Sequence, residues 1–295
     1  MILPMGNREL ELGGEHLGHL RESKDIEGDM PALRARLDED GYLLLRGLHD
    51  VESVKAARRV VLADLDAREQ IDRSHPRDEG IIAESGGGAF LGGRKAVTHT
   101  DEFLSVVEAP SLMTFFTDLF DGESLAYDYK WLRAVPTGAS TGAHYDVVYM
   151  GRGSLDLVTL WTPLGDVSYD MGPLAVLEGS QTFAEVRDTY GKMDVDRDHV
   201  TGSFSDDPLA LIEQYGGRWL TTEFETGDAL IFRMFTMHGS LANTTPRFRL
   251  SADTRYQRAD QPVDERWMGD EPVAHYAWTK GETVTMDEAR RRWGV

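Results

Sequence analysis

From about residue 124 onward, the chain is a succession of short apolar segments that glycine, proline or aspartate interrupts every few residues. Many short strands separated by turns are typical of β-sandwiches and β-barrels. Helical spacing occurs between them at 180–191 and 206–216. The pattern predicts strands over 124–135, 144–150, 155–162, 173–178, 218–224, 228–235 and 247–257.

The first 120 residues have a different pattern. The spacing of apolar residues predicts a short helix and then a strand over 30–48, with Gly41 between them, and a helix over 51–70. The stretch 103–120 is apolar enough for one or two helices, because Pro110 interrupts it. We therefore expect one domain, with helices early and a β-sandwich from the middle onward.

Two further segments have recognisable patterns. Residues 71–100 are rich in glycine and charge, and a loop of that length is often functional. At the other end of the chain, 285–294 predicts a helix that Thr285 caps, with Glu288 three residues further on.

Composition excludes several kinds of site and partner. The 295 residues include no cysteine, so disulfides and thiolate ligands are absent, and any metal must be held by nitrogen and oxygen atoms. The 31 basic and 51 acidic residues give a net charge of −20, which repels nucleic acid and anionic lipid. No apolar run approaches the roughly 20 residues that cross a bilayer, and the N-terminus does not resemble a signal peptide. We expect a cytoplasmic protein with neither nucleic acid nor membrane as partner.

Residues 141–150, TGAHYDVVYM, place a histidine and an aspartate two positions apart. In an extended segment, His144 and Asp146 leave the same face of the strand and can bind one metal ion together. His99 and Asp101 form a second pair of this kind and are a competing metal site. Five further histidines lie in charged or terminal stretches and are expected to be solvated: His16, His19, His49, His75 and His275.

His238 lies in a different context. It follows the apolar segment 229–235, at the end of a predicted strand, where a scaffold presents ligands at low conformational cost. Arg249 comes eleven residues later, and Ser251 shares its face if that segment is a strand. A guanidinium fork and a hydroxyl can hold a carboxylate. Alternatively, these two residues form the solvated face of the strand.

Two histidines and one carboxylate, at 144, 146 and 238, match the facial triad of non-haem Fe(II) oxygenases. Three ligands on one face of an octahedron leave two positions for a bidentate 2-oxo acid and one for dioxygen. An arginine such as Arg249 would neutralise the far carboxylate of the acid. The glycine-rich stretch 86–93 lacks the Lys-Ser/Thr of a phosphate-binding loop, so no nucleotide site competes.

Three ordered motifs resemble those of the phytanoyl-CoA dioxygenase family of Fe(II)/2-oxoglutarate-dependent oxygenases, across residues 40 to 257. They are GAHYD at 142–146, LWTPLGDVSYDMGPLAVLEGSQ at 160–181 and MHGSLANTTPRFRLS at 237–251. The second resembles the family's Trp-x-Pro-Leu, its Gly-Pro-Leu turn and its closing GSH, here GSQ. The third resembles the family's HGS-x-x-N, which an arginine follows eleven residues after the histidine.

The resemblance implies a mainly β fold with flanking helices (α+β), namely a double-stranded β-helix, or cupin-like jelly roll. It implies a single dioxygenase domain over 1–295. That domain would comprise a helical N-terminal part over about 1–120, a jelly-roll core over about 124–257 and a C-terminal extension over 258–295.

The resemblance also implies the chemistry. His144, Asp146 and His238 would bind Fe(II), and Arg249 would bind the distal carboxylate of 2-oxoglutarate. With O2 as the second co-substrate, an unactivated C–H bond of a small molecule would be hydroxylated, and succinate and CO2 would be released. Related halogenases have a small residue in place of the aspartate, so Asp146 favours hydroxylation. Further candidates for the 2-oxoglutarate site are Ser240, Trp161 and Ser251.

For the substrate pocket we expect a contribution from the early segments, with residues around 86–93 as a lid. Aromatic candidates for its wall are Tyr145, Tyr149 and Trp131, although core packing is the more common role of such residues. Arg133 and Arg152 are candidates for contact with an acidic group of the substrate, or else solvated surface residues.

Two other classes of function stay open at this point. A redox-neutral, cupin-like isomerase or hydrolase could use zinc or manganese on the same ligands, and it would need neither Arg249 nor oxygen. A jelly-roll protein could also bind 2-oxoglutarate or another ligand without turnover.

Overall fold

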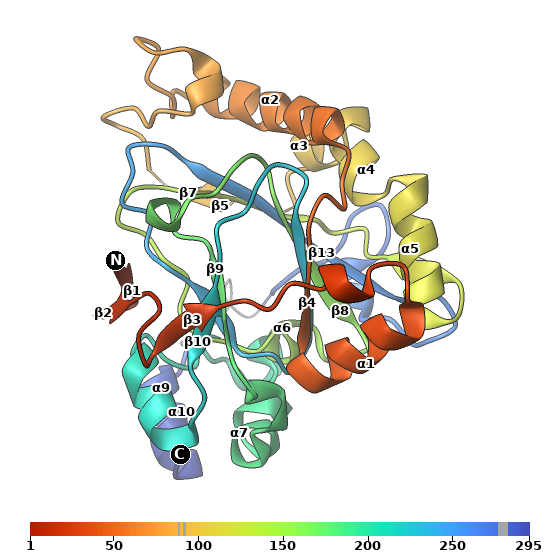
Figure 1. The fold of residues 1–295 in the computed structure, drawn as a ribbon, viewed down its shortest axis with the longest axis vertical. Coiled ribbons are helices and arrows are strands. Elements are labelled where there is room, and N and C mark those ends of the chain that lie inside the picture. Colours follow the sequence, from red (N-terminus) through yellow and green to blue (C-terminus); the bar gives the residue numbers. More distant parts are fainter. Residues whose placement is uncertain (88, 91–92, 277–282) are drawn as a thin grey trace.

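The computed structural model describes residues 1–295 except 88, 91–92 and 277–282. Its strands are β1 (Ile2–Met5), β2 (Arg8–Glu11), β3 (Leu17–His19), β4 (Tyr42–Leu45), β5 (Ala89–Phe90), β6 (Ser124–Ala126), β7 (Trp131–Val135), β8 (Val158–Pro163), β9 (Leu174–Leu177), β10 (Trp219–Thr221), β11 (Ala229–Arg233), β12 (His238–Ser240) and β13 (Arg249–Arg258). The larger sheet has the order β4–β11–β8–β13–β7–β5, and β6 also pairs with β13. The smaller sheet has the order β12–β9–β10–β3, and β1 and β2 form a hairpin (Figure 1).

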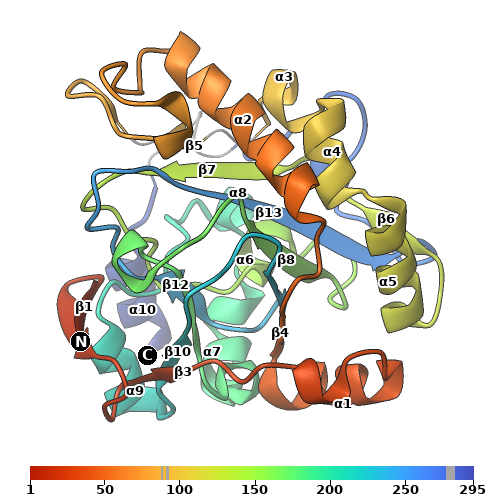
Figure 2. The ribbon, with the colours of Figure 1, turned by 45° about the horizontal axis from the view of Figure 1, so that its top comes forward.

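The helices lie mainly outside the sheets. They are α1 (Met30–Asp40), α2 (Val51–Ala67), α3 (Lys95–Thr98), α4 (Asp101–Val107), α5 (Pro110–Phe120), α6 (Val147–Met150), α7 (Ala184–Asp188), α8 (Val195–Asp198), α9 (Pro208–Tyr215) and α10 (Met286–Trp293). Helices α2, α3 and α4 lie over β7 and β13, and α9 and α10 lie together near both chain ends (Figures 1 and 2).

Helices bury the outer face of the larger sheet. Val61 of α2 and Phe103 of α4 pack with Leu250 of β13 in one apolar cluster. Helices α1 and α5 cover the neighbouring half of the sheet, where Phe116 stacks on Tyr256 with ring centroids 4.0 Å apart. The outer face is thus closed to solvent, and the inner face is left for a site.

A second core lies between the two sheets. In β11, Ala229 and Ile231 face the helices, whereas Leu230 and Phe232 face Val176 of the smaller sheet. Because both faces of this strand are buried, its sequence is a continuous apolar run rather than an alternating one. Two facing sheets with flanking helices confirm the predicted jelly roll.

Most predicted strands are present, with three differences. The segment 144–150 is not a continuous strand: it turns into helix α6, because the N–H groups of Tyr149 and Met150 bond back to the carbonyl of Asp146. His238 does not open a loop but begins strand β12. The first 20 residues, expected within a helical part, contain the short strands β1, β2 and β3.

The expectation that no apolar run approaches the length of a membrane span was wrong: among the described residues, Asp101–Phe120 has 20 residues with a mean hydropathy of 1.3, enough by length and composition to cross a membrane. It divides into α4 and α5, and Pro110 opens the second helix, as its sequence allowed. The buried side chains of both helices pack against the larger sheet. Packing on the core therefore accounts for the apolar character of this stretch.

The predicted loop 71–100 contains short elements, namely β5, α3 and a bridge between Ile71 and Ile82. The proposed lid at 86–93 includes residues 88, 91 and 92, which lie outside the described part of the chain. Its role, and the assignment of the whole chain to one domain, stay predictions.

Two histidines expected to be solvated are not. His49 is buried, with its Nε2 3.0 Å from the hydroxyl of Thr162 on β8. Burial lowers the pKa of His49 from 6.5 to about 4. The side chain of His275 is 11% exposed and its Nδ1 lies 2.9 Å from a carboxylate oxygen of Asp196. The charged residues around both histidines in sequence gave no sign of this burial.

His49 makes the stability of the fold depend on pH. Below pH 6.5 the unfolded chain protonates this imidazole but the folded chain does not, so the free energy of unfolding falls as the pH drops from 6.5 to about 4. The slope is at most about 1.4 kcal/mol per pH unit for one such group. We expect His49→Gln, measured by urea unfolding across this range, to lose less stability on acidification than the wild type.

The matched control is His75→Gln, since the side chain of His75 is 50% exposed. Its stability should follow the wild-type pH curve. Parallel curves for the wild type and His49→Gln would contradict the assignment of this proton to His49.

Candidate active site

Two of the predicted metal ligands are joined through their backbones. The N–H of His144 donates to the carbonyl of His238 over 2.9 Å, and the N–H of His238 donates back over 3.0 Å. Residues that exchange both bonds of an antiparallel pair point their side chains to the same face, and the two imidazole centroids lie 4.1 Å apart.

The backbone also fixes which ring nitrogens are available. Nδ1 of His144 lies 2.9 Å from the carbonyl of Gly142, and Nδ1 of His238 lies 2.9 Å from the carbonyl of Thr236. A carbonyl only accepts hydrogen bonds, so each Nδ1 carries the proton. Each Nε2 is thereby left unprotonated and able to bind a metal.

Asp146 completes the group. Its Oδ1 lies 3.7 Å from Nε2 of His144 and 3.7 Å from Nε2 of His238. The three ligand atoms lie within 4.8 Å of one another, and among the described residues no other group of histidines and carboxylates gathers in this way. Nitrogen and oxygen atoms from two imidazoles and one carboxylate suit Fe(II).

The second carboxylate oxygen of Asp146 is occupied by the protein. Oδ2 accepts a hydrogen bond from the hydroxyl of Thr159 and another from Nη2 of Arg255, at 3.0 Å. The Arg255 guanidinium lies 4.3 Å from the ring centroid of Trp131. These contacts turn Oδ1 toward the imidazoles and leave one oxygen of Asp146 for a metal.

The protonation states also suit a metal. Burial, together with the neighbouring His238, lowers the pKa of His144 to about 3, and burial lowers the pKa of His238. Burial acts to raise the pKa of Asp146, but the Arg255 guanidinium and the imidazoles outweigh it and hold that pKa well below its usual range. At neutral pH the group is two neutral imidazoles and one carboxylate, the form that binds metal without losing protons.

Arg249 lies in the same small cavity as the three ligands and is 2% exposed. Its Nη1 donates to the hydroxyl of Ser251 over 3.1 Å, and its Nε has no hydrogen-bond partner. No described carboxylate forms an ion pair with it, because Asp253 pairs with Arg133 and Asp146 with Arg255.

Burial lowers the pKa of Arg249 to about 10, so the guanidinium stays charged at neutral pH. A buried charge without a partner is costly. A carboxylate of 2-oxoglutarate is the kind of group that would complete this site, and the residues present therefore fit the co-substrate.

The other predicted co-substrate residues lie nearby. Trp161 lines the cavity, and the Arg249 guanidinium lies 5.8 Å from its ring centroid. Ser240 also lines it, and its hydroxyl accepts from the N–H of Thr141 over 2.9 Å. Ser251 is fully buried and contacts Arg249, so its place is behind the arginine.

The remaining predicted site residues divide into two groups. Trp131, Tyr149 and Arg133 line a larger cavity that also reaches His144 and Asp146.

Tyr145, Arg152 and His99 lie elsewhere. The hydroxyl of Tyr145 donates to the carbonyl of Ser180, inside the core, and Arg152 pairs with Asp194. His99 contacts the hydroxyl of Thr98, and its partner in sequence, Asp101, is exposed. The competing metal site at 99 and 101 is therefore not assembled.

Sequence reasoning missed the two residues that hold Asp146. Arg255 had a signal, because the alternation that places Arg249 and Ser251 on one face of β13 continues through Asp253 to Arg255. Thr159 had no such signal in the sequence, since its contact with Asp146 exists only once β8 lies next to that residue in the fold.

A jelly roll that holds two buried histidines and one buried carboxylate, with a buried arginine beside them, is typical of the class of Fe(II)- and 2-oxoglutarate-dependent oxygenases. The family model for phytanoyl-CoA dioxygenase (PhyH) matches residues 37–251. The chain belongs to this family.

Two curated relatives have named activities, and each is 27% identical in sequence to this chain. The chain is 27% identical over 241 residues to 1-deoxypentalenic acid 11-beta-hydroxylase of Streptomyces exfoliatus, covering 78% of this chain and 82% of the relative. It is also 27% identical over 240 residues to L-proline trans-4-hydroxylase of Streptomyces griseoviridis, covering 76% and 85%.

Solved structures share the fold. The epimerase SnoN from nogalamycin biosynthesis, a non-heme alpha ketoglutarate dependent enzyme, superposes with a TM-score of 0.57 at 17% identity, covering 87% of this chain and 95% of that one. EctD from S. alaskensis with 2-oxoglutarate and 5-hydroxyectoine gives a TM-score of 0.56 at 19% identity, covering 96% and 95%.

The hydroxyl of Thr159 helps to hold Asp146, so its removal should weaken metal binding. The substitution Thr159→Val removes this hydroxyl and keeps the shape of the side chain. We expect the affinity for Co(II) or Ni(II), measured by calorimetry, to fall about 10- to 100-fold, because groups that hold metal ligands typically contribute that much. Thr162→Val on the same strand removes a hydroxyl that contacts His49 instead, and it should bind metal like the wild type. Equal affinities for all three proteins would contradict the role of Thr159.

Proposed function

We propose that the protein hydroxylates an unactivated C–H bond of a small molecule, with 2-oxoglutarate and O2 as co-substrates. The observation that carries this proposal is a buried His–Asp–His group beside Arg249, a guanidinium without a carboxylate partner among the described residues. The two curated relatives, named as hydroxylases of a terpenoid acid and of an amino acid, support a small-molecule substrate.

His144, Asp146 and His238 would hold the iron ion. When bound, the ion with 2-oxoglutarate and O2 supplies the oxidant that replaces hydrogen by hydroxyl at the substrate carbon, while 2-oxoglutarate becomes succinate and CO2. The presence of Asp146 favours hydroxylation over halogenation, because a carboxylate occupies the place where halide would bind.

The other residues of the site would bind 2-oxoglutarate and orient the ligand Asp146. Arg249 would hold the distal carboxylate of 2-oxoglutarate, and Ser251 would keep the guanidinium in place. Trp161 and Ser240 would flank the co-substrate in the small cavity. Arg255 and Thr159 would hold Asp146 so that one of its oxygens stays available for iron.

Arg249 also separates this proposal from a redox-neutral metalloenzyme on the same ligands. Such an enzyme has no use for a buried cation next to its metal, whereas a dianionic co-substrate requires one. We place the enzyme in the cytoplasm, since the chain has no cysteine, and we expect neither nucleic acid nor membrane as partner for a chain of net charge −20.

The proposal predicts the fate of both atoms of O2. With Fe(II), 2-oxoglutarate, ¹⁸O2 and a small-molecule panel, we expect one labelled oxygen in succinate and one in the hydroxylated product, by mass spectrometry. His144→Ala should abolish both. Product formation that does not require 2-oxoglutarate, or unlabelled product, would contradict the proposal.

The assignment of Arg249 has its own test. We expect Arg249→Met to raise the 2-oxoglutarate concentration at half-maximal succinate formation by about 100-fold, the equivalent of losing a charge-assisted pair. Arg247→Met is the matched control, because Arg247 lies two residues away and its side chain is 50% exposed. Equal effects of the two substitutions would remove Arg249 from the co-substrate site.

A further inference from the structure

A second cavity, of about 510 Å³, adjoins His144 and Asp146, and Arg249 is not part of its lining. His238, Trp161 and Arg249 line only the small cavity. The two cavities share the residues Arg133, Thr141, His144, Asp146 and Arg255. A volume of this size suits a small molecule. If the small cavity takes 2-oxoglutarate, the larger one is where the primary substrate meets the metal.

Aromatic side chains form the apolar wall of this cavity. Tyr129 and Trp131 lie edge to face with centroids 4.6 Å apart, and Trp267 packs behind Trp131 at 4.7 Å. Tyr149 and Met150 add further apolar surface near the metal ligands. Such a wall binds a hydrocarbon body and offers it no counter-charge.

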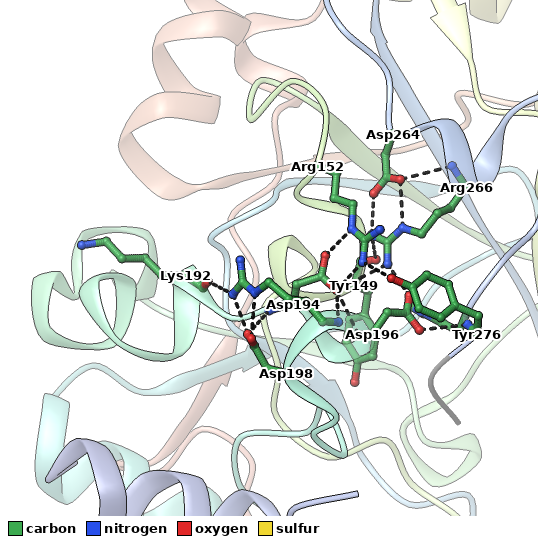
Figure 3. Close-up of polar contacts among 11 residues, drawn as sticks. Tyr149, Arg152, Lys192, Asp194, Asp196, Asp198, Asp264, Arg266 and Tyr276 are labelled. Atoms are coloured by element: carbon green, nitrogen blue, oxygen red, sulfur yellow. Dashed lines mark hydrogen bonds and ion pairs between the residues drawn. The ribbon is translucent and has the colours of Figure 1, made fainter. Parts of the chain in front are cut away.

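A network of ion pairs holds this wall in place (Figure 3). Arg266 donates to the carbonyl of Tyr149 over 2.8 Å and pairs with Asp264 and Asp196. Asp196 in turn contacts His275, which lines the cavity. These contacts hold the backbone of Tyr149 and the ring of His275 in place before a ligand arrives, which lowers the entropic cost of binding.

The charges around the two cavities do not balance. Three arginines line them, at 133, 249 and 255, against the carboxylates of Asp146 and Asp253, and the two histidine ligands are neutral. Among the described side chains one positive charge is in excess. An Fe(II) ion and a 2-oxoglutarate dianion cancel each other, so the excess persists in the loaded site.

Arg133 and Arg255 are the two arginines that line the larger cavity, and of these Arg133 is the better placed to meet a ligand. Its Nε donates to Asp253 over 2.7 Å, which fixes the direction of the guanidinium. Its side chain is 28% exposed, against 3% for Arg255, whose Nη2 is committed to Asp146. Arg133 is thus the more exposed of the two arginines that line this cavity.

We propose that the primary substrate is an apolar small molecule with one free carboxylate, which Arg133 binds while the hydrocarbon body lies against Trp131 and Tyr149. This places part of the body beside His144 and Asp146, where hydroxylation would occur. The inference rests on the proposed function for its chemistry, but its prediction about charge also holds for the metal-free protein.

The test uses three hydrocarbon skeletons of increasing size: cyclohexane, octane and adamantane. Each is supplied as carboxylate, primary amide and amine, so that charge changes and shape does not. Binding is measured by calorimetry, both on metal-free protein and on protein loaded with Ni(II) and 2-oxoglutarate. We expect at least one acid to bind about 10- to 100-fold more tightly than its amide, the range of a charge-assisted hydrogen bond, and the amine to bind no better than the amide.

Variants of Arg133 identify the residue responsible. Arg133→Met should remove the preference for the acid and leave amide binding unchanged, whereas Arg133→Lys should retain part of the preference. The matched control is Arg233→Met, because Arg233 is also a strand arginine, 27% exposed, that pairs with an aspartate, Asp38. It lies outside the linings of both cavities and should bind every probe like the wild type.

Three results would overturn the proposal: no acid binds more tightly than its amide, the preference survives Arg133→Met, or Arg133→Met weakens 2-oxoglutarate binding instead. The last would assign Arg133 to the co-substrate. Failure of the iron and 2-oxoglutarate site is seen separately, as loss of Ni(II)-dependent 2-oxoglutarate binding, while the metal-free titrations still report the preference for acids.

Discussion

The pair of backbone hydrogen bonds between His144 and His238 is the contact on which the site depends. These bonds hold the segment 141–144 alongside β12, although the two are far apart in sequence, and both imidazoles therefore point to the same side. The approach is close: a Cβ on Gly239 would lie 2.8 Å from the carbonyl of Thr141, so only glycine fits there. Asp146 then needs only the turn into α6 to meet the two rings, and the jelly roll supplies a rigid frame that keeps this pairing in register.

The inner face of β13 carries charged side chains that surround this contact. Arg255 is committed to Asp146, and Asp253 is committed to Arg133, which leaves Arg249 buried without a described carboxylate. One strand thus carries the arginine that holds Asp146, the aspartate that pairs with Arg133, and the buried Arg249, where we propose that an anionic co-substrate binds. Because successive inward side chains are two residues apart, these tasks follow one another along the strand without competing for space.

The sequence was informative where the chemistry is local or where ligand types are rare. That His144, Asp146 and His238 gather near Arg249 and Trp161 could be predicted from motifs. The Thr285 hydroxyl caps α10 as predicted, accepting from the N–H of Glu288. The turn at Asp146 could not be found, because valine and tyrosine favour strands and tertiary packing overrides that preference. The contacts of Thr159 and the burial of His49 could not be predicted either, since both depend on side-chain contacts between β8 and segments far away in sequence.

The central claim is that Fe(II) and 2-oxoglutarate meet at His144, Asp146 and His238. The most direct measurement is an anaerobic titration of metal-free protein with Fe(II) and then 2-oxoglutarate, following the visible charge-transfer band that arises when a 2-oxo acid chelates iron. We predict a saturable band at one iron per chain that His238→Ala abolishes while the protein stays folded. A folded, iron-loaded wild type without the band, or a band that survives His238→Ala, would contradict the account.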